Sequence, residues 1–383
     1  MVRNPSRLTP HRYVRSSAEL ATLMRRVSRE PLVAVDTEAA SFHRFVDRIY
    51  LIQLSVRRET AIIDPLTVDD MSTLGTVLAD PAIEVVFHDG DYDLRILDRD
   101  YGFHARRLFD TRIAAHLLGE PAVGLAALVE KHVGVTLDKK YQRADWSRRP
   151  LPPEMLEYAA TDTRYLLELR EKLRGLLEAR GRLSWAEEEF ERLEGVRWTP
   201  PEGNGDAYLR MKGARKLGRR ALAVLRELVP WRDGIAAELD RATFRVISNE
   251  ALLALSEAPP RSQADLERVG GISSRLMVER GDSLLATVER GLAVPEKDLP
   301  RPPRAERRTP DPAFDKAVER LKGLRNAAAE RLGLDPGVLC PNGTLEAVAR
   351  ARPASAAALE VIPEVRRWQI EVLGGDFLKA LGN

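Results

Sequence analysis

Two carboxylates interrupt an otherwise apolar segment near the N-terminus. Asp36 and Glu38 lie in LVAVDTEA, a short run rich in β-branched residues that predicts a strand over residues 32–39. Side chains two residues apart in a strand project from one face, so the two carboxylates lie together. Because two like charges about 4 Å apart repel by about 1 kcal/mol even in bulk water, a buried pair needs a cation. A solvated strand end is the alternative, and this pair alone favours it.

A second acidic cluster, HDGDYDLRIL, follows the strand signal EVVF at the point where a helix is expected to begin. We expect Asp89 or Asp91 to cap that helix, because an N-cap carboxylate satisfies unpaired backbone N–H groups. Asp93 lies beside Leu94 inside the helical pattern, where capping is no longer the obvious role. We expect His88 to fill the turn before the helix.

A third cluster lies in LEYAATDTRYLLEL, where Tyr158 and Asp162 are four residues apart and share one helix face with Leu166. An aspartate on the apolar face of a helix is costly unless it is paired, hydrogen-bonded or bound to a metal. Three acidic clusters favour Mg²⁺ or Mn²⁺, and no convincing histidine or cysteine set competes for a metal. Two such ions about 3.5–4 Å apart can hydrolyse a phosphodiester.

The elements that must position these residues alternate between strand and helix. Short β-branched runs predict strands over residues 32–39, 48–56, 60–65 and 84–89. Helical patterns follow at residues 70–79, 91–99, 111–118, 124–132 and 153–179. Three early strands in a row indicate antiparallel hairpins, and strands separated by helices indicate parallel additions. We therefore expect a mixed sheet with helices on its faces.

Two proline-rich stretches, residues 196–206 and 291–312, divide the chain. Both segments that follow the first stretch have helical patterns, and they repeat one another at a constant offset of 93 residues. The repeated residues are Arg232, Leu252, Pro260, Ser262, Leu266 and Gly281, which recur as Arg325, Leu345, Pro353, Ser355, Leu359 and Gly374. A constant offset over some fifty positions indicates a duplicated small helical domain.

Composition limits the class of protein. The chain has 383 residues, 44% of them hydrophobic and 31% charged, with a net charge of +2. This composition supports a buried core, and the length predicts two or three domains. The single cysteine, Cys340, excludes an internal disulfide framework and fits a reducing compartment. The N-terminus lacks the apolar core of a signal peptide, and no apolar run is long enough for a membrane span. We expect a cytoplasmic protein without a membrane partner.

Local basic segments are the candidate nucleic-acid contacts. One precedes the third acidic cluster and contains Lys139, Lys140, Arg143, Arg148 and Arg149. Tyr141 and Trp146 lie among these cations, and such a mixture can contact phosphates and stack on bases. A solvated loop is the alternative. A second basic segment opens the first helical repeat and contains Arg210, Lys212, Arg215, Lys216, Arg219 and Arg220.

The two repeats differ at one turn between helices. The first repeat has Gly270-Gly271 there, a turn that can present backbone N–H groups to a phosphate. The second repeat has Pro363-Glu364 at the same position. Packing on the rest of the protein is therefore the alternative to nucleic-acid binding for the second repeat.

The order of the three acidic clusters resembles a known family. DTE, FHDGDYDL and YAATD look like the three motifs of the DEDD 3′–5′ exonucleases, in the subgroup whose third motif carries a tyrosine. DTRIAAHLLG and DWSRRPLPPEMLEYAATDTRYLLEL resemble the bacterial ribonuclease D family, and the C-terminal repeats resemble HRDC domains. An exonuclease followed by two HRDC-like units is the arrangement of that family, so the resemblance covers nearly the whole chain.

The resemblance implies a fold and a domain order. An α/β ribonuclease H-like (DnaQ-like) exonuclease domain with a mixed sheet would span residues 1–200. An HRDC domain would follow at residues 207–290, and a second, HRDC-like domain at residues 313–383. The implied reaction is hydrolysis of the 3′-terminal phosphodiester of RNA, with release of nucleoside 5′-monophosphates. The implied partner is RNA with a free 3′ end, tRNA precursors among such RNAs, and a monomer is the expected state.

The resemblance also assigns roles to single residues. Asp36, Glu38, Asp93 and Asp162 would hold two divalent cations, Mg²⁺ or Mn²⁺. Tyr158 would orient the attacking water, because a phenol with a pKa near 10 suits hydrogen bonding better than general-base chemistry at neutral pH.

Rival residues flank this set. Asp91 competes with Asp93, and the family pattern selects Asp93 because it directly precedes a leucine. Asp110 is expected to cap the helix at residues 111–118 rather than bind a metal.

Two other functions remain open on the sequence. The same carboxylate chemistry serves DNA exonucleases, and HRDC domains also bind DNA, so a DNA 3′–5′ exonuclease is one alternative. The other is a nucleic-acid binding scaffold that has lost catalysis, although every ligand position is filled here.

Overall fold

The computed structural model describes residues 11–200, 206–301 and 311–382. These residues form two compact units. The first unit contains described residues 11–38, 49–198 and 311–382, and the second contains residues 39–48, 199–200 and 206–301. Parts of both proline-rich stretches, residues 201–205 and 302–310, lie outside the described residues.

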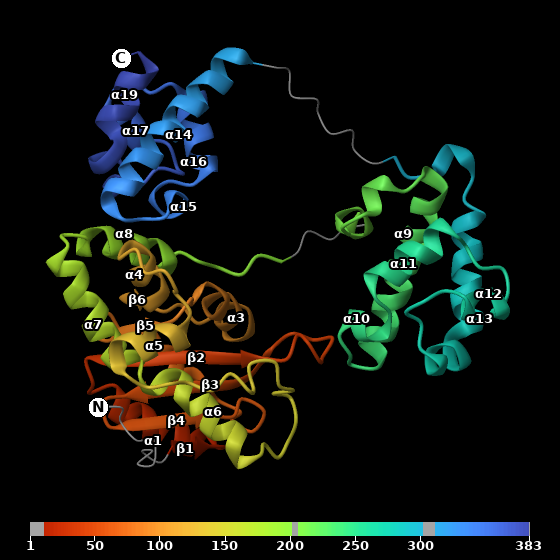
Figure 1. Ribbon diagram of the computed structural model, residues 1–383. Coiled ribbons are helices and arrows are strands. Elements are labelled where there is room, and N and C mark those ends of the chain that lie inside the picture. Colours follow the sequence, from red (N-terminus) through yellow and green to blue (C-terminus); the bar gives the residue numbers. More distant parts are fainter. Residues whose placement is uncertain (1–10, 201–205, 302–310, 383) are drawn as a thin grey trace. The chain divides into compact units, whose positions relative to one another are not determined.

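A six-stranded mixed sheet forms the centre of the first unit, with the strand order β1-β4-β3-β2-β5-β6 (Figure 1). Its strands are β1 (His11–Val14), β2 (Leu32–Ala39), β3 (Ile49–Val56), β4 (Glu59–Ile63), β5 (Glu84–Phe87) and β6 (Leu108–Asp110). β3 and β4 are antiparallel, whereas β1 with β4, β2 with β5, and β5 with β6 are parallel. The predicted mixed sheet is thus confirmed, and the short strands β1 and β6 were not predicted.

Eight helices accompany the sheet among the described residues that precede the repeats. They are α1 (Ser17–Val27), α2 (Ser72–Leu78), α3 (Asp91–Tyr101), α4 (Thr111–Leu117), α5 (Leu125–Val133), α6 (Pro153–Arg164), α7 (Leu166–Ala179) and α8 (Leu183–Glu194). The helix expected over residues 153–179 is in fact two helices, which meet at Tyr165. α1 and α8 were not predicted.

Hydrogen bonds between small polar side chains join α6 to the sheet. The Ser55 hydroxyl on β3 lies 2.8 Å from the Thr163 hydroxyl on α6 and 2.9 Å from the Thr60 hydroxyl on β4. All three residues are buried, so the bonds are protected from water. The helix that carries Tyr158 and Asp162 is therefore held at a defined position over β3 and β4.

The first helical repeat, with the segment 39–48, makes up the second unit and has its own apolar core. Its main helices are α9 (Arg219–Glu238), α11 (Asn249–Glu257) and α13 (Ser274–Leu292), with the shorter η1 (Ala207–Arg210), η2 (Ala214–Lys216), α10 (Thr243–Val246), α12 (Gln263–Glu267) and η3 (Glu296–Asp298). The segment 39–48 hydrogen-bonds to this repeat, because Ala242 N donates to the His43 carbonyl over 3.2 Å.

The second helical repeat belongs to the first unit, and its core is continuous with the core around the sheet. Its elements are α14 (Pro312–Leu332), α15 (Pro336–Leu339), α16 (Asn342–Ala351), α17 (Ala356–Glu360), α18 (Arg367–Gln369), the π-helical η4 (Ile370–Gly374) and α19 (Gly375–Leu381). No helix among the described residues is both long and apolar enough to cross a bilayer.

The same side-chain contact occurs in both repeats. In the first repeat, Arg232 donates to the Asn249 side-chain oxygen over 2.7 Å. In the second repeat, Arg325 donates to the Asn342 side-chain oxygen over 2.8 Å. Both residues of the second contact lie 93 positions after those of the first, which is the offset read from the sequence. The boundaries expected for the three domains stay a prediction.

Candidate active site

Three carboxylates from two elements converge at the floor of one cleft. Asp36 and Glu38 come from β2 and Asp162 from α6, and one oxygen of each lies within 4.8 Å of the others. The two β2 residues share a face because they are two apart in the strand. The cleft has a volume of about 630 Å³, and Asp93 and Tyr158 also line it. The structure therefore brings together all five residues of the three acidic motifs.

Asp93 reaches the cleft from the first turn of α3, and Thr37 holds it there. The Thr37 hydroxyl donates to Asp93 Oδ1, which joins β2 to α3 inside the protein. Asp93 is 7% exposed and Thr37 is 9% exposed, so water does not compete for this bond. The middle residue of DTE thus fixes the second motif, a role that sequence reasoning missed. The sequence feature that could have indicated this role is Thr37 itself, a polar residue between two carboxylates in an apolar strand.

Burial and mutual repulsion disfavour ionisation of these carboxyl groups. Burial raises the pKa of Asp93 to about 6 and that of Asp162 to about 7. Burial and the neighbouring Asp93 and Asp162 raise the pKa of Asp36 well above its ordinary value. Burial and Asp36 do the same to the pKa of Glu38. A cation among the carboxylate oxygens would favour their ionised form and so lower these pKa values.

Tyr158 is packed between two aromatic rings of the segment before α6. Its ring centroid lies 5.8 Å from that of Tyr141 and 6.1 Å from that of Trp146. Burial, followed by the charges of Asp162 and Glu38, raises the pKa of the Tyr158 phenol above its ordinary value. The hydroxyl therefore stays protonated and can donate a hydrogen bond in the cleft.

The turn before α3 differs from the expected capping arrangement. The N-cap residue is Gly90, and no side chain caps the helix. Asp91 pairs with Arg95 over 2.7 Å instead, and Asp89 pairs with Arg112 over 2.5 Å. The prediction that Asp89 or Asp91 caps α3 is therefore wrong, because each carboxylate has a cation partner nearby.

Asp110 caps α4, as expected. Its Oδ1 accepts from Arg112 N over 2.8 Å and from Ile113 N over 2.9 Å, and its Oδ2 accepts from Gly90 N over 2.8 Å. The same carboxylate thus joins the starts of α3 and α4. Its oxygens serve backbone N–H groups rather than the metal cluster.

His88 lines the cleft beside α4. Its Nδ1 lies 2.9 Å from the Thr111 hydroxyl. Burial lowers the pKa of His88 to about 4, so the ring is neutral at neutral pH. Arg112 and Gln142 also line the cleft, and sequence reasoning missed both. Neither residue lies in one of the three acidic motifs, so the sequence around them did not indicate that they would line the cleft.

The basic segment before α6 divides into exposed and buried residues. Lys139 lines the cleft, and Lys140, Arg143 and Arg148 are exposed. Trp146 is 1% exposed, which corrects the expectation that its ring stacks on bases.

Arg149 uses all of its N–H donors within the protein. The guanidinium makes two 2.7 Å bonds to Asp64 and donates to the carbonyl oxygens of Tyr50, Trp146 and Arg148. A guanidinium has five N–H donors, so none remains for a phosphate. This arrangement corrects the prediction that Arg149 binds nucleic acid.

The basic segment of the first helical repeat is mostly exposed, but two of its arginines have partners within the repeat. Arg210, Lys212, Arg215, Lys216 and Arg219 are exposed, and Arg220 is half-buried. Arg219 donates to the Leu299 carbonyl over 3.1 Å, and Arg220 donates to the Leu292 carbonyl over 2.9 Å. These two arginines hold the end of the repeat against the start of α9, a structural role that their sequence did not indicate.

The donor set of the cleft fits divalent cations. Carboxylate oxygens are the ligands that Mg²⁺ and Mn²⁺ prefer. Asp36, Glu38 and Asp162 are the one group of three or more potential ligands found in the described part of the chain. Burial raises the pKa values of these carboxyl groups, repulsion between them adds to this at Asp36 and Glu38, and a bound cation would counter both effects.

Comparison with known sequence families agrees with this geometry. Residues 11–178 match the family described as 3′-5′ exonuclease, and residues 221–288 and 314–381 each match the HRDC domain. The first match contains all five residues of the acidic motifs, and the other two cover the repeats.

Individual relatives match over most of their length. Ribonuclease D of Granulibacter bethesdensis is 32% identical over 97% of this chain and 93% of its own. Ribonuclease D of Escherichia coli is 36% identical over 81% of this chain and 82% of its own. The crystal structure of Escherichia coli RNase D, described as an exoribonuclease involved in structured RNA processing, covers 97% of this chain and 98% of its own. Its TM-score is 0.70 at 30% identity. The chain therefore belongs to the ribonuclease D family of 3′–5′ exoribonucleases.

Proposed function

We propose that Asp36, Glu38, Asp93 and Asp162 hold two divalent cations, Mg²⁺ or Mn²⁺, at the floor of the cleft. The observation that carries this proposal is the convergence of half-buried carboxyl groups whose pKa values are raised. When bound, such ions activate a water molecule and stabilise the leaving oxygen of a phosphodiester. The four carboxylates would hold the ions at the floor of the cleft. The Thr37 hydroxyl keeps the Asp93 carboxylate directed toward them.

Tyr158 positions the attacking water in this proposal. Its hydroxyl stays protonated because burial raises its pKa, so it acts as a hydrogen-bond donor rather than a base. Its ring lies between those of Tyr141 and Trp146, which limits the directions in which the hydroxyl can point. A fixed donor reduces the entropy lost when the water is aligned with the phosphorus.

The substrate in this proposal is RNA with a free 3′ end, including tRNA precursors, and the products are nucleoside 5′-monophosphates. Lys139 at the rim of the cleft, with the exposed Lys140, Arg143 and Arg148, supplies positive charge for the RNA backbone. On the first helical repeat, the exposed cations Arg210, Lys212, Arg215 and Lys216 are further contacts for the RNA backbone in this proposal.

The protein acts in the cytoplasm as a monomer in this proposal. The lone Cys340 is buried as a free thiol, and burial raises its pKa to about 12. A thiol in that state is unreactive, and a chain with no second cysteine suits a reducing compartment.

The proposal requires a substrate with a free 3′-hydroxyl, and this requirement provides its test. Two RNAs of one sequence, one ending in a 3′-hydroxyl and the other in a 3′-phosphate, are incubated with the protein and Mn²⁺, and the products are identified by mass spectrometry. The 3′-hydroxyl RNA should release nucleoside 5′-monophosphates one at a time, and the 3′-phosphate RNA should be degraded far more slowly. Nucleoside 3′-monophosphates, or internal fragments from both RNAs, would contradict the proposal.

A further inference from the structure

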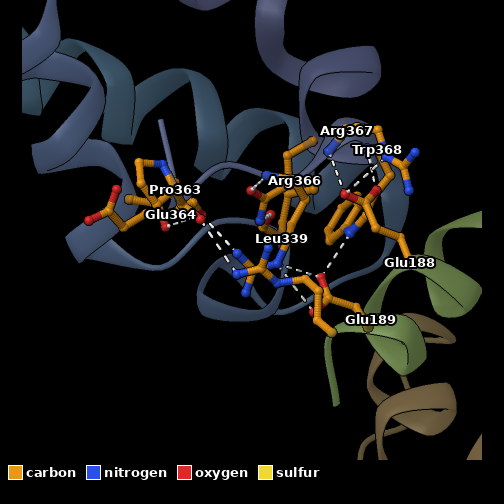
Figure 2. A network of polar contacts seen from close by, with 11 residues as sticks. Glu188, Glu189, Leu339, Pro363, Glu364, Arg366, Arg367 and Trp368 are labelled. Atoms are coloured by element: carbon orange, nitrogen blue, oxygen red, sulfur yellow. Dashed lines mark hydrogen bonds and ion pairs between the residues drawn. The ribbon is translucent and has the colours of Figure 1, made fainter. Parts of the chain in front are cut away.

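The second helical repeat contacts α8 through a carboxylate that binds the start of a helix. Glu188 Oε1 accepts from Arg367 N over 2.8 Å, and Glu188 Oε2 accepts from Trp368 N over 3.1 Å (Figure 2). These two N–H groups belong to the first turn of α18, where they have no partner within the helix. A carboxylate is favoured there because it also interacts with the helix dipole. The Glu188 side chain is only 12% exposed.

The neighbouring Glu189 binds two side chains of the same turn. It accepts from Arg366 Nε over 3.1 Å and from the indole nitrogen of Trp368 over 2.9 Å (Figure 2). The Trp368 ring also stacks on Trp185 of α8, with the centroids 5.0 Å apart. Trp368 is 3% exposed, so the contact excludes water. Consecutive residues of α8 thus hold consecutive residues of the repeat.

The first repeat lacks this chemistry at the equivalent positions. Ser273, Ser274 and Arg275 lie 93 residues before Arg366, Arg367 and Trp368. Ser273 caps its own helix by accepting from Leu276 N over 3.2 Å, and Arg275 pairs with Glu279 over 2.8 Å on the same helix. The residues that bind α8 are therefore particular to the second repeat.

One buried arginine joins the same repeat to α4. Arg182 donates to the Leu117 carbonyl at the end of α4 over 2.8 Å and to the Leu332 carbonyl at the end of α14 over 2.6 Å. The last carbonyls of a helix have no hydrogen-bond partner within that helix. The Arg182 guanidinium therefore supplies a donor to one such carbonyl at the end of each of the two helices. Gly119 allows the backbones to approach, because a Cβ there would lie 2.0 Å from the Gly333 oxygen.

The opposite end of α4 forms part of the cleft. Arg112 lines the cleft beside the metal-ligand candidates, and Thr111 contacts His88. Asp110, the N-cap of α4, also binds Gly90 N at the start of the helix that carries Asp93. A seven-residue helix is short enough to transmit a displacement of one end to the other.

We infer that the second helical repeat is a positioning element for the catalytic site, held on α4 and α8 by Arg182, Glu188 and Glu189. This inference rests on the proposed function. In this inference, the first repeat is the one that contacts RNA. The second repeat keeps α4 in place.

The test compares two double variants of the full-length protein. E188Q/E189Q removes the two carboxylates that hold the repeat. E178Q/E187Q is the matched control, because the exposed Glu178 and Glu187 pair with Arg174 of α7 rather than with the second repeat. Three quantities are measured: hydrogen exchange of the α4 amides, kcat and KM on a 5′-labelled RNA, and the affinity for that RNA in EDTA.

In E188Q/E189Q, exchange within α4 should rise and kcat should fall by roughly tenfold, because the helix end at the cleft is less well positioned. RNA affinity should change less than about twofold, and the control variant should match the wild type. An unchanged kcat despite faster exchange would overturn the positioning role. A several-fold change in RNA affinity would show that this helix start contacts RNA.

A charge exchange provides a second route if the double variant does not fold. R366E and E189R should each lower kcat, and the combination should recover part of the loss because the ion pair is restored in reverse. Absence of recovery would contradict the inference. Neither result depends on the identity of the metal, and wild-type activity on the same RNA reports separately on the proposed function.

Discussion

Arg149 and Asp64 form a two-bond ion pair that joins the segment before α6 to the end of β4. The Arg149 Nε and Nη2 atoms each lie 2.7 Å from an Asp64 oxygen, and Asp64 is 1% exposed. The pair lowers the pKa of Asp64, although burial alone would raise it. Since Arg149 lies four residues before α6, this contact fixes the entry to the helix that carries Tyr158 and Asp162.

Replacing Arg149 by lysine should therefore impair catalysis. Lysine keeps the charge but has three donors on a flexible chain, so it cannot reproduce both Asp64 bonds and the carbonyl bonds. We expect kcat to fall by about tenfold or more, KM to change little, and the free energy of unfolding to drop by about 1–3 kcal/mol. R57K is the control and should behave as the wild type, because the exposed Arg57 pairs with Glu171 and is not among the proposed RNA contacts. A rise in KM with kcat unchanged would indicate that Arg149 contacts RNA after all.

Replacing Asp162 or Asp36 by asparagine should separate activity from stability. We expect kcat to fall by at least about 10³-fold, because a metal ligand is lost. The metal-free protein should unfold at the same or a higher temperature, because one repelling carboxylate is removed. D91N is the control, since Asp91 pairs with Arg95 outside the cluster, and its activity should stay within about twofold. A large drop in the melting temperature of D162N would mean that the carboxylate stabilises the fold.

Tyr158→Phe should lower kcat without affecting metal affinity. The phenylalanine ring retains the packing against Tyr141 and Trp146, and only the hydroxyl is lost. We expect kcat to fall by about 10–100-fold, with unchanged Mn²⁺ affinity in calorimetric titration. Wild-type activity should also show no ionisation of a tyrosine below about pH 9, because the pKa of Tyr158 is raised. Full activity of Y158F would remove the hydroxyl from the mechanism.

Stabilisation by Mn²⁺ should grow as the pH rises. The pKa values of Asp93 and Asp162 are raised to about 6 and about 7 from an ordinary value of 3.8, so the folded metal-free protein binds more protons than the unfolded chain between those values. Their contribution to stability is therefore present at low pH and is lost as the pH rises to about 7. Metal binding offsets this loss because it requires the ionised carboxylates.

The corresponding measurement is the melting temperature with and without Mn²⁺ at about pH 5.5 and about pH 7.5. The increase caused by Mn²⁺ should be clearly larger at the higher pH, and D162N should show little increase at either. An equal increase at both pH values in the wild-type protein would show that these carboxyl groups are not the ligands.

Much of the fold could be predicted because its signals are local. The β-branched runs at residues 32–39 and 48–56 coincide with β2 and β3, and the 93-residue offset reappears as two equivalent Arg–Asn contacts. The three-residue strand β6 was missed because LFD is too short to show a period. β1 was missed for a related reason, since its four residues are ordered mainly by pairing with β4.

The roles of individual cations could not be predicted, because their partners are distant in the sequence. Arg149 and Asp64 are 85 residues apart, so nothing near Arg149 indicated a buried pair. The same holds for Arg219, whose carbonyl partner Leu299 is 80 residues away. Lysines and arginines have similar sequence patterns whether they face solvent or complete an internal network. The hydrogen-bond partners, which only the fold brings together, separate these cases.

The most direct test of the account is a time course with 5′-labelled RNA and DNA of one sequence in Mg²⁺ or Mn²⁺, with EDTA and D162N as controls. The account predicts stepwise shortening of the RNA from its 3′ end, much slower shortening of the DNA, and no shortening in either control. Preferential shortening of the DNA would contradict the assignment of RNA as substrate. Binding of both polymers without shortening of either would contradict the assignment of a catalytic site.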